Sequence, residues 1–105
     1  MEEVLKAISD GTRRDILVLI WRQEMPAGII ASNFAMSRPA VSQHLKVLKD
    51  AGLVEERRVG VQRLYKARPE GLHEVRSFLE GFWNDRLLDL KLAVEKDKGG
   101  NDGGN

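Results

Sequence analysis

One stretch of the sequence carries a row of side chains that could contact a polyanion. Between Ser37 and Gly52, a helical spacing of about 100° per residue gathers basic, hydroxyl and amide groups on one side. These are the groups with which proteins contact the phosphates and base edges of nucleic acids. The residues that we expect to contact nucleic acid there are Ser37, Arg38, Pro39, Ser42, Gln43, Lys46 and Lys49.

The opposite side of the same stretch is apolar, which indicates a helix packed on a core. Val41, Leu45 and Leu48 follow helical spacing on that side. The ends are marked as well, since Ser37 is a good N-cap residue and Gly52 suits a left-handed C-cap. On its own, such a helix is more often a surface helix whose charges are merely solvated.

Positive charge is concentrated around this helix. The whole chain of 105 residues has a formal net charge of +1. Residues 36–68 alone have +5, whereas residues 1–35 have −1 and residues 69–105 have −3. A basic zone inside a nearly neutral chain is typical of a surface that binds a polyanion.

Length and composition exclude several other classes of protein. A chain of 105 residues suits one domain with a modest core. It has no cysteine, which excludes disulfides, thiolate metal sites and cysteine nucleophiles. It also has no run of about 18 apolar residues and no secretion signal. We therefore expect a cytoplasmic protein that does not enter a membrane.

Three short helices are predicted before the basic one. They cover residues 2–9, 12–23 and 27–34, and a turn at 24–26 separates the last two. The run ILVLIW in the second is apolar nearly all round, which indicates a central, buried helix. Only about three residues separate the third helix from the basic helix, which is typical of a helix-turn-helix. In that motif the second helix enters the major groove of DNA.

A basic β-hairpin, which we call the wing, is predicted directly after the basic helix. Residues 54–58 and 62–67 suit two short strands, and Gly60 can take the positive φ of the turn between them. Arginines here could simply protect an edge strand from aggregation, but the preceding helix-turn-helix favours contacts with DNA. The wing residues that we expect to contact DNA are Arg57, Arg58, Gln62 and Arg63.

A long helix over residues 71–95 is predicted to follow the wing. Its length of roughly 37 Å, at 1.5 Å per residue, exceeds what a domain of this size can cover. Its apolar stripe therefore indicates a partner helix, most simply from a second copy of the chain. We expect a folded domain over residues 1–96 and a disordered tail over 97–105. The residues expected at the dimer interface are Val4, Leu5, Ile8, Leu72, Val75, Leu79, Phe82 and Trp83.

Three stretches together resemble the winged-helix repressors of the ArsR/SmtB family. They are AISDGTRRDIL at 7–17, SRPAVSQHLKVLKDAGLV at 37–54 and RRVGVQRLYKA at 57–67. The resemblance implies a mainly α fold with a small β-hairpin, in the order α-α-α-α-β-β-α, that dimerises through its first and last helices. It also implies that the helix of residues 38–49 binds an operator in the major groove, with the wing beside the minor groove. The base contacts that it implies fall on Arg38, Pro39, Ser42 and Gln43.

Two positions depart from the family pattern. Ala35 stands where the family often has Gly or Asn, and a left-handed conformation there would cost alanine about 1 kcal/mol. Val61 follows the wing glycine where the family often has Arg, which removes one expected contact from the wing tip. The last helix, with FWNDRLLDL at 82–90, resembles a subgroup of members that act without a metal.

No metal, cofactor or catalytic site is expected. His44 has no histidine or carboxylate at i±3 or i±4, which favours a structural histidine. His73 and Glu74 open the last helix, where some family members bind zinc, but a second histidine further along is missing. Trp21 and Trp83 suit core or interface anchors, with a ligand pocket at Trp83 as the less favoured alternative. Because the sequence has no nucleophile–base pair and no Gly-rich phosphate loop, we expect no enzyme.

The sequence therefore predicts a protein that binds double-stranded DNA sequence-specifically and regulates transcription, most simply as a homodimeric repressor. The alternative is a winged-helix module for protein assembly, whose basic face binds an acidic partner. Ser42 and Gln43 favour DNA, because a hydroxyl and an amide can read base edges whereas contacts with an acidic partner need only charge. An inducer, either a small molecule or a protein, is left open.

Overall fold

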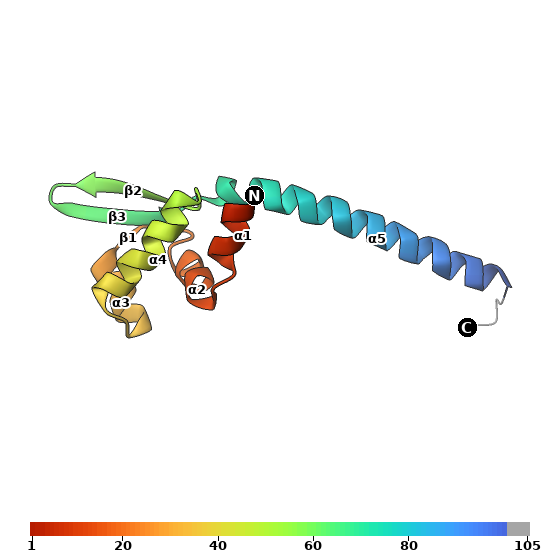
Figure 1. Cartoon of the computed structure of the whole chain (residues 1–105), viewed down its shortest axis with the longest axis horizontal. Helices are drawn as coiled ribbons and strands as arrows, with labels where there is room; N and C mark the ends of the chain where they lie inside the picture. The colour runs from red at the N-terminus through yellow and green to blue at the C-terminus, as the bar shows by residue number, and fades with distance from the viewer. Residues whose placement is uncertain (101–105) are drawn as a thin grey trace. The chain divides into compact units, whose positions relative to one another are not determined.

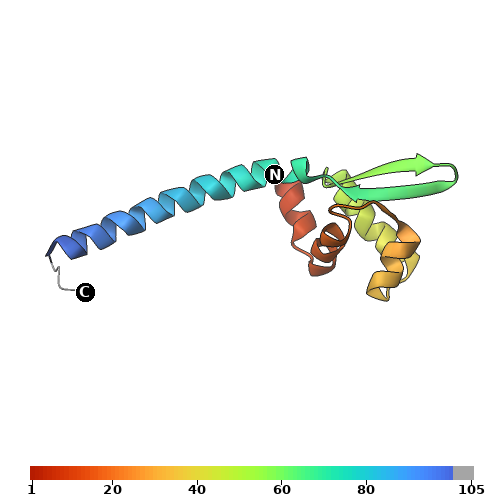
Figure 2. The same ribbon diagram turned by 180° about the vertical axis from the view of Figure 1, so that it is seen from behind.

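A computed structural model describes the backbone of residues 1–100 and the side chains of residues 1–95 (Figures 1 and 2). The chain divides into two units, Met1–Val75 and a second unit that begins at Arg76. We describe each unit by itself. The predicted disordered tail lies partly outside the described residues, which end before residue 101.

The first unit has the predicted order of helices and strands, with one added strand. Its elements are α1 (Glu2–Ile8), α2 (Gly11–Leu19), β1 (Met25–Pro26), α3 (Ala27–Phe34), α4 (Arg38–Asp50), β2 (Val54–Val59), β3 (Gln62–Ala67) and the short 3-10 helix η1 (Pro69–Leu72). The predicted winged helix-turn-helix fold is therefore confirmed in this unit. α3 and α4 form the helix-turn-helix, and β2 and β3 form the wing (Figure 1).

The added strand corrects the prediction of a plain turn at residues 24–26. β1 pairs antiparallel with β3, so the sheet has the order β1-β3-β2. Met25 lies opposite Tyr65 and Pro26 opposite Leu64. Proline lacks a backbone N–H and is tolerated at the edge of a sheet, which is where this strand lies. The strand thereby fixes the wing to the segment that leads into α3.

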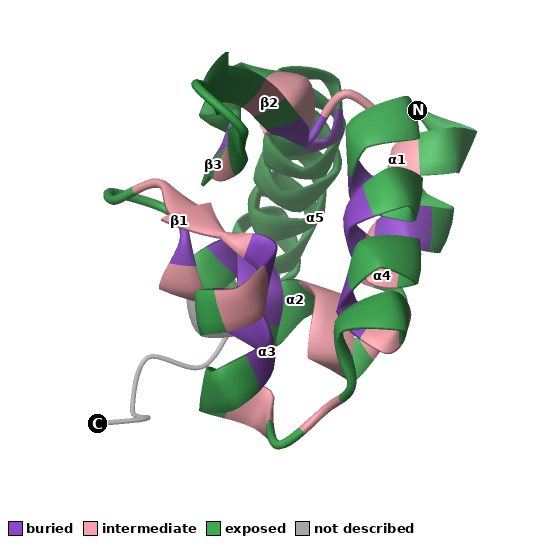
Figure 3. Cartoon of the chain, turned by 90° about the vertical axis from the view of Figure 1, so that its left-hand side faces the viewer, coloured by how far each residue is buried: buried purple, intermediate pink, exposed green. Residues whose placement is uncertain are grey.

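The core lies between the four helices and the base of the wing (Figure 3). The largest fully buried side chains are Ile16, Ile20, Ile30, Leu45, Leu48, Leu53 and Val41. The second helix is shorter than predicted and is not buried all round, because α2 ends at Leu19 and Val18 is 75% exposed. Trp21, predicted as a core or interface anchor, lies beyond α2 and is 37% exposed.

Polar groups of the segment SDGTRRD join α1 to α2. The Asp10 side chain accepts a hydrogen bond from the Arg13 backbone N–H at 3.1 Å and so caps α2. The Arg13 guanidinium donates to the carbonyls of Ala7 and Lys6, at 2.7 Å and 3.2 Å. Arg14 donates to the carbonyl of Ile8 at 2.7 Å. The last carbonyls of α1, which have no partner within the helix, are thus satisfied by the next helix.

Backbone conformation at both ends of α4 follows the sequence signals. Ser37 Oγ accepts from the Ala40 N–H at 3.2 Å, which confirms the predicted N-cap. Gly52 has φ +80° and its N–H donates to the carbonyl of Lys49, while the N–H of Leu53 donates to Leu48. This pair of bonds is a Schellman C-cap.

The last helix, α5 (His73–Gly100), begins two residues later and ends five residues later than predicted. It therefore includes residues 97–100, which the sequence assigns to the tail. Among residues 76–95 the apolar side chains are all exposed, including Phe78, Leu79, Phe82 and Trp83. The Phe78 and Phe82 rings stack with centroids 6.3 Å apart, and Arg86 lies 4.9 Å from the Phe82 ring centre. No helix among the described residues is both long enough and apolar enough to cross a membrane.

The turn between α3 and α4 contains a left-handed residue, Ala35, at the position where the family often has Gly or Asn. Ala35 has φ 52° and is exposed, so its Cβ is strained without any packing in return. We expect Ala35→Gly to raise the free energy of unfolding by up to about 1 kcal/mol in urea titrations. The control is Ala51→Gly, at a position with φ −84°, which should lower it. Equal effects of the two changes would contradict the assignment of strain to Ala35.

Candidate nucleic-acid interface

The outward side of α4 carries every side chain that the sequence assigned to it. Ser37, Arg38, Pro39, Ser42, Gln43, Lys46 and Lys49 are all exposed, whereas Val41, Leu45 and Leu48 are at most 1% exposed. The Ser37 hydroxyl is used as the helix cap, so the side chains free to read DNA bases begin at Arg38. The burial of the apolar side therefore fixes which groups α4 presents to solvent.

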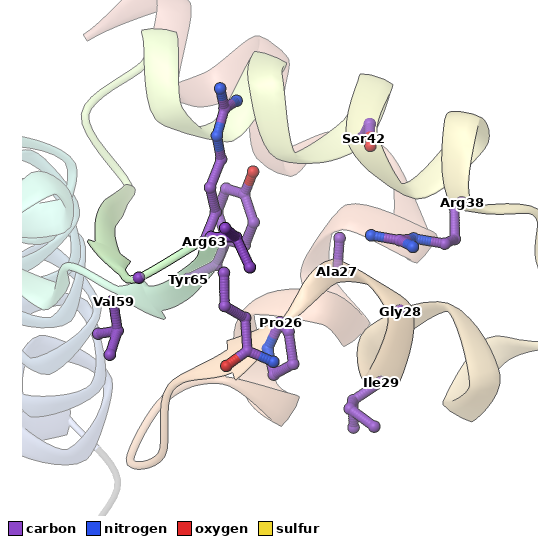
Figure 4. A pocket seen from close by; sticks show the side chains of 12 residues that line it. Pro26, Ala27, Gly28, Ile29, Arg38, Ser42, Val59, Arg63 and Tyr65 are labelled. Carbon is purple, nitrogen blue, oxygen red and sulfur yellow. The ribbon is translucent and has the colours of Figure 1, made fainter.

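A cleft of about 910 Å³ separates α4 from the wing (Figure 4). Arg38 and Ser42 line it from α4, and Arg63 and Tyr65 line it from β3. The start of α3 closes one side, where a Cβ added to Gly28 would meet the Arg38 side chain at 3.7 Å. Besides apolar residues and Gln62, the lining of the cleft includes two guanidinium groups and two hydroxyls, all of which can bind phosphate oxygens.

Four basic side chains of the predicted interface are paired with carboxylates, namely Lys46, Lys49, Arg57 and Arg63. Lys46 lies 3.0 Å from Asp50, one turn along α4. Lys49 lies 2.7 Å from Glu56 on β2, and Arg63 lies 3.4 Å from the same carboxylate. Sequence analysis missed Glu56, although it stands two residues after the buried Val54 on β2, so that both side chains point to the same face of the strand.

The wing arginines predicted to contact DNA lie on opposite faces of the hairpin. The register places Arg58 opposite Arg63, on the face that also carries Glu56. Arg57 belongs to the other face, by the alternation of side chains along a strand, whereas Gln62, next to the wing turn, lines the cleft beside Arg63. On that face Arg57 Nε donates to both carboxylate oxygens of Glu24, at 3.0 Å and 2.9 Å. The pair ties β2 to the segment before β1.

These pairs shift the pKa values of the groups involved. The hydrogen bond from Arg57 lowers the pKa of the Glu24 carboxyl and raises that of Arg57 itself. In the same way, the hydrogen bond from Lys49 lowers the pKa of Glu56, and the bond to Glu56 raises the pKa of Lys49. All four groups are therefore ionised at neutral pH.

Two arginines outside this surface, Arg68 and Arg13, have structural partners. Arg68, counted with the basic hairpin, donates from Nη1 to the carbonyl of Gly52 at 3.3 Å. Gly71 packs so closely on this carbonyl that an added Cβ would lie 2.2 Å from its oxygen.

His44 Nδ1 lies 3.5 Å from Arg13 Nη1, where α1, α2 and α4 meet. Among the described residues, no group of three or more His, Asp or Glu side chains could hold a metal ion.

The residues predicted for dimerisation fall into two groups. Leu5, Leu79, Phe82 and Trp83 are exposed. Val4, Ile8 and Leu72 are partly buried against the core of the first unit. Val75 differs from the prediction, since it is 5% exposed in the single chain and belongs to that unit's buried residues. The apolar surface of α5 that is open to a partner therefore begins after Val75.

The Glu24–Arg57 pair makes the stability of the wing depend on pH. Because the folded-state pKa of Glu24 is below its ordinary 4.5, its contribution is complete above pH 4.5 and is lost as pH falls through the lowered value. Glu24→Gln should lower the thermal midpoint at pH 7 and flatten its fall under acidic conditions. Arg57→Met should do the same. Variant and wild-type curves that remain parallel throughout would contradict a native role for this pair.

Comparisons with known proteins agree with this geometry. The arsR family of bacterial regulatory proteins matches residues 10–56, which cover α2 to the start of the wing. The chain is 45% identical over 92 residues to the HTH-type transcriptional regulator Rv2034 of Mycobacterium tuberculosis, covering 88% of this chain and 86% of that protein. It is 39% identical over 90 residues to the transcriptional repressor SdpR of Bacillus subtilis, covering 86% and 100% respectively.

A solved structure shares the fold as well. It is the homodimeric winged helix-turn-helix DNA-binding domain Mb0332 of Mycobacterium bovis, described as a possible ArsR-family regulator. The TM-score is 0.65 and the identity 30%, over 82% of this chain and 80% of that one. The exposed polar side of α4, the basic wing and these relatives lead to one conclusion. The chain belongs to the ArsR family of bacterial regulatory proteins and is a DNA-binding regulator of transcription.

Proposed function

We propose that this protein is a homodimeric repressor that binds an operator through α4 in the major groove, with the wing beside the minor groove. The observation that carries the proposal is the two-sided character of α4. Its apolar side is buried, and its outer side presents the guanidinium of Arg38 and, one turn later, the hydroxyl of Ser42 and the amide of Gln43. A helix that reads base edges needs this combination of a fixed orientation and mixed donors and acceptors.

The positions of the side chains on α4 and the wing divide them into groups that contact bases and groups that contact phosphates. Arg38, Ser42 and Gln43 lie in the N-terminal half of α4, the part that meets base edges in this motif. Lys46 and Lys49 lie towards its C-terminal end and carry compact charges that suit phosphates. Arg58 and Arg63 extend this basic surface onto the wing. Base contacts therefore come from the first group and phosphate contacts from the other two.

Support for the dimer comes from α5 and from a relative. α5 exposes apolar side chains from Phe78 to Val94, and such a surface suits a partner helix. The Mycobacterium bovis domain is described as homodimeric, and SdpR is named a repressor. A twofold dimer would present two α4 helices to half-sites about one helical turn apart.

Other properties of the proposed regulator follow from its class. Its relatives are named as regulators of transcription, so we propose that it acts by binding DNA in the cytoplasm and has no enzymatic activity. We further propose that it needs no metal, because the chain has no cysteine and His44 is engaged with Arg13. An inducer would then act on a surface other than a metal site.

The first test separates base reading from phosphate holding. Gln43→Ala should cost roughly 1–3 kcal/mol of binding free energy on the operator and little on random DNA. Arg58→Ala should weaken both DNAs about equally and reduce the slope of log affinity against log salt by about one unit. Arg57→Ala, on the opposite face and paired with Glu24, serves as the matched wing control with a smaller effect. Fluorescence anisotropy over a salt series, with the upstream region of the gene as probe, measures all three.

Three results would count against these roles. Equal weakening of both DNAs by Gln43→Ala would remove it from base reading. A larger effect of Arg57→Ala than of Arg58→Ala would reverse the two faces of the wing. If the wild-type chain binds no duplex more tightly than competitor DNA, the assembly of an acidic protein partner on the basic face becomes the favoured function.

The second test concerns the dimer. Leu79→Glu or Phe82→Glu should place an unpaired charge in the proposed interface and cost several kcal/mol of dimerisation free energy. Ser77→Glu, on the opposite side of α5, should leave the dimer intact. Sedimentation velocity at micromolar concentration distinguishes monomer from dimer. A wild-type chain that sediments as a monomer would refute the proposal.

A further inference from the structure

A single carboxylate joins α4 to the wing across the basic surface. Glu56 Oε1 accepts a hydrogen bond from Lys49 Nζ at 2.7 Å, and Glu56 Oε2 lies 3.4 Å from Arg63 Nε. The Glu56 side chain is only 17% exposed, whereas those of Lys49 and Arg63 are 52% and 57% exposed. The two cations therefore face solvent, and the anion lies between and beneath them.

The position of Glu56 changes what a DNA phosphate meets at this surface. The hydrogen bond from Lys49, together with the charges of Arg63 and Arg58, lowers the pKa of Glu56 and keeps it ionised at neutral pH. A phosphate that approaches Lys49 or Arg63 must compete with this carboxylate and is repelled by its charge. Two of the basic groups that the sequence assigned to DNA binding are thus partly neutralised before DNA arrives.

We propose that Glu56 determines specificity: by occupying Lys49 and Arg63, it weakens binding to DNA that lacks the operator more than binding to the operator. Binding to random DNA rests almost entirely on contacts between cations and phosphates. The operator complex adds base contacts, which fix the register of the protein on the duplex. If Lys49 and Arg63 were free, they would therefore add more affinity to the complex with random DNA, where the protein can shift its register to place both cations on phosphates. This inference rests on the proposed binding of the operator through α4 and the wing.

Glu55 provides a matched control on the same strand. It lies next to Glu56 in the sequence but on the opposite face of β2, across from Lys66 on β3. It is exposed and makes no ion pair among the described residues. Glu55→Gln therefore removes the same charge from the wing as Glu56→Gln, without freeing Lys49 or Arg63.

The experiment compares both variants with the wild type on two duplexes over a salt series. The probes are the tightest-binding duplex selected from a random library and a scrambled duplex of equal length. Glu56→Gln should raise affinity for the scrambled duplex about tenfold and steepen its salt slope by one to two units. Affinity for the selected duplex should rise about threefold or less, so that the ratio of the two affinities falls. Glu55→Gln should leave this ratio unchanged.

A second set of variants tests whether Glu56 acts through Lys49 and Arg63. In a chain with both Lys49→Met and Arg63→Met, Glu56→Gln should no longer steepen the salt slope, because the cations that it frees are absent. Equal gains on both duplexes, or no difference between the Glu56 and Glu55 variants, would overturn the inference. So would weaker binding to both duplexes with a lowered thermal midpoint, since that marks a purely structural role. If the wild type itself does not prefer the selected duplex, the proposed function fails first and the inference falls with it.

Discussion

The burial of one side of α4 is the constraint on which the rest of this structure depends. Val41, Leu45 and Leu48 lie against a core to which α1, α2, α3 and β2 all contribute. Each such side chain contributes roughly 1.5–3 kcal/mol by leaving water, so rotating the helix would be costly. Because the helix cannot rotate, Arg38, Ser42 and Gln43 must face solvent. The hydrophobic effect thus decides which groups are available to read DNA.

The ion pairs around α4 affect the binding of DNA more than the stability of the fold. Exposed ion pairs such as Lys46–Asp50 contribute little to folding, typically below about 1 kcal/mol. They nevertheless decide how many cations can bind a phosphate without first giving up an ion pair with a carboxylate. Glu56 and Glu24 hold Lys49 and Arg57 in place and reduce the net charge of the wing. The formal +5 of residues 36–68 therefore overstates the charge that DNA encounters.

Local signals in the sequence predicted local features of the structure. Ser37 acts through a hydroxyl that reaches a backbone N–H three residues later, and Gly52 and Gly60 act through their own backbone conformation, so the cap, the helix end and the wing turn were all predictable. Features that depend on distant segments were not. β1 exists because Met25 and Pro26 meet β3, and Arg57 is paired because a segment 33 residues earlier lies beside it. Periodicity also could not show that Val18 faces solvent, since an all-apolar run has no polar side.

The exposed apolar side chains of α5 connect folding to binding in the proposed dimer. An isolated helix in water is marginal, and most helical stability comes from packing of an apolar face. From Phe78 to Val94, the apolar residues of α5 have no such packing in the single chain. If a second copy supplies it, the same contact also sets the distance between the two α4 helices and so the spacing of the half-sites. A ligand that altered this packing would change operator affinity without touching Arg38 or Gln43, which is the linkage that an inducible regulator requires.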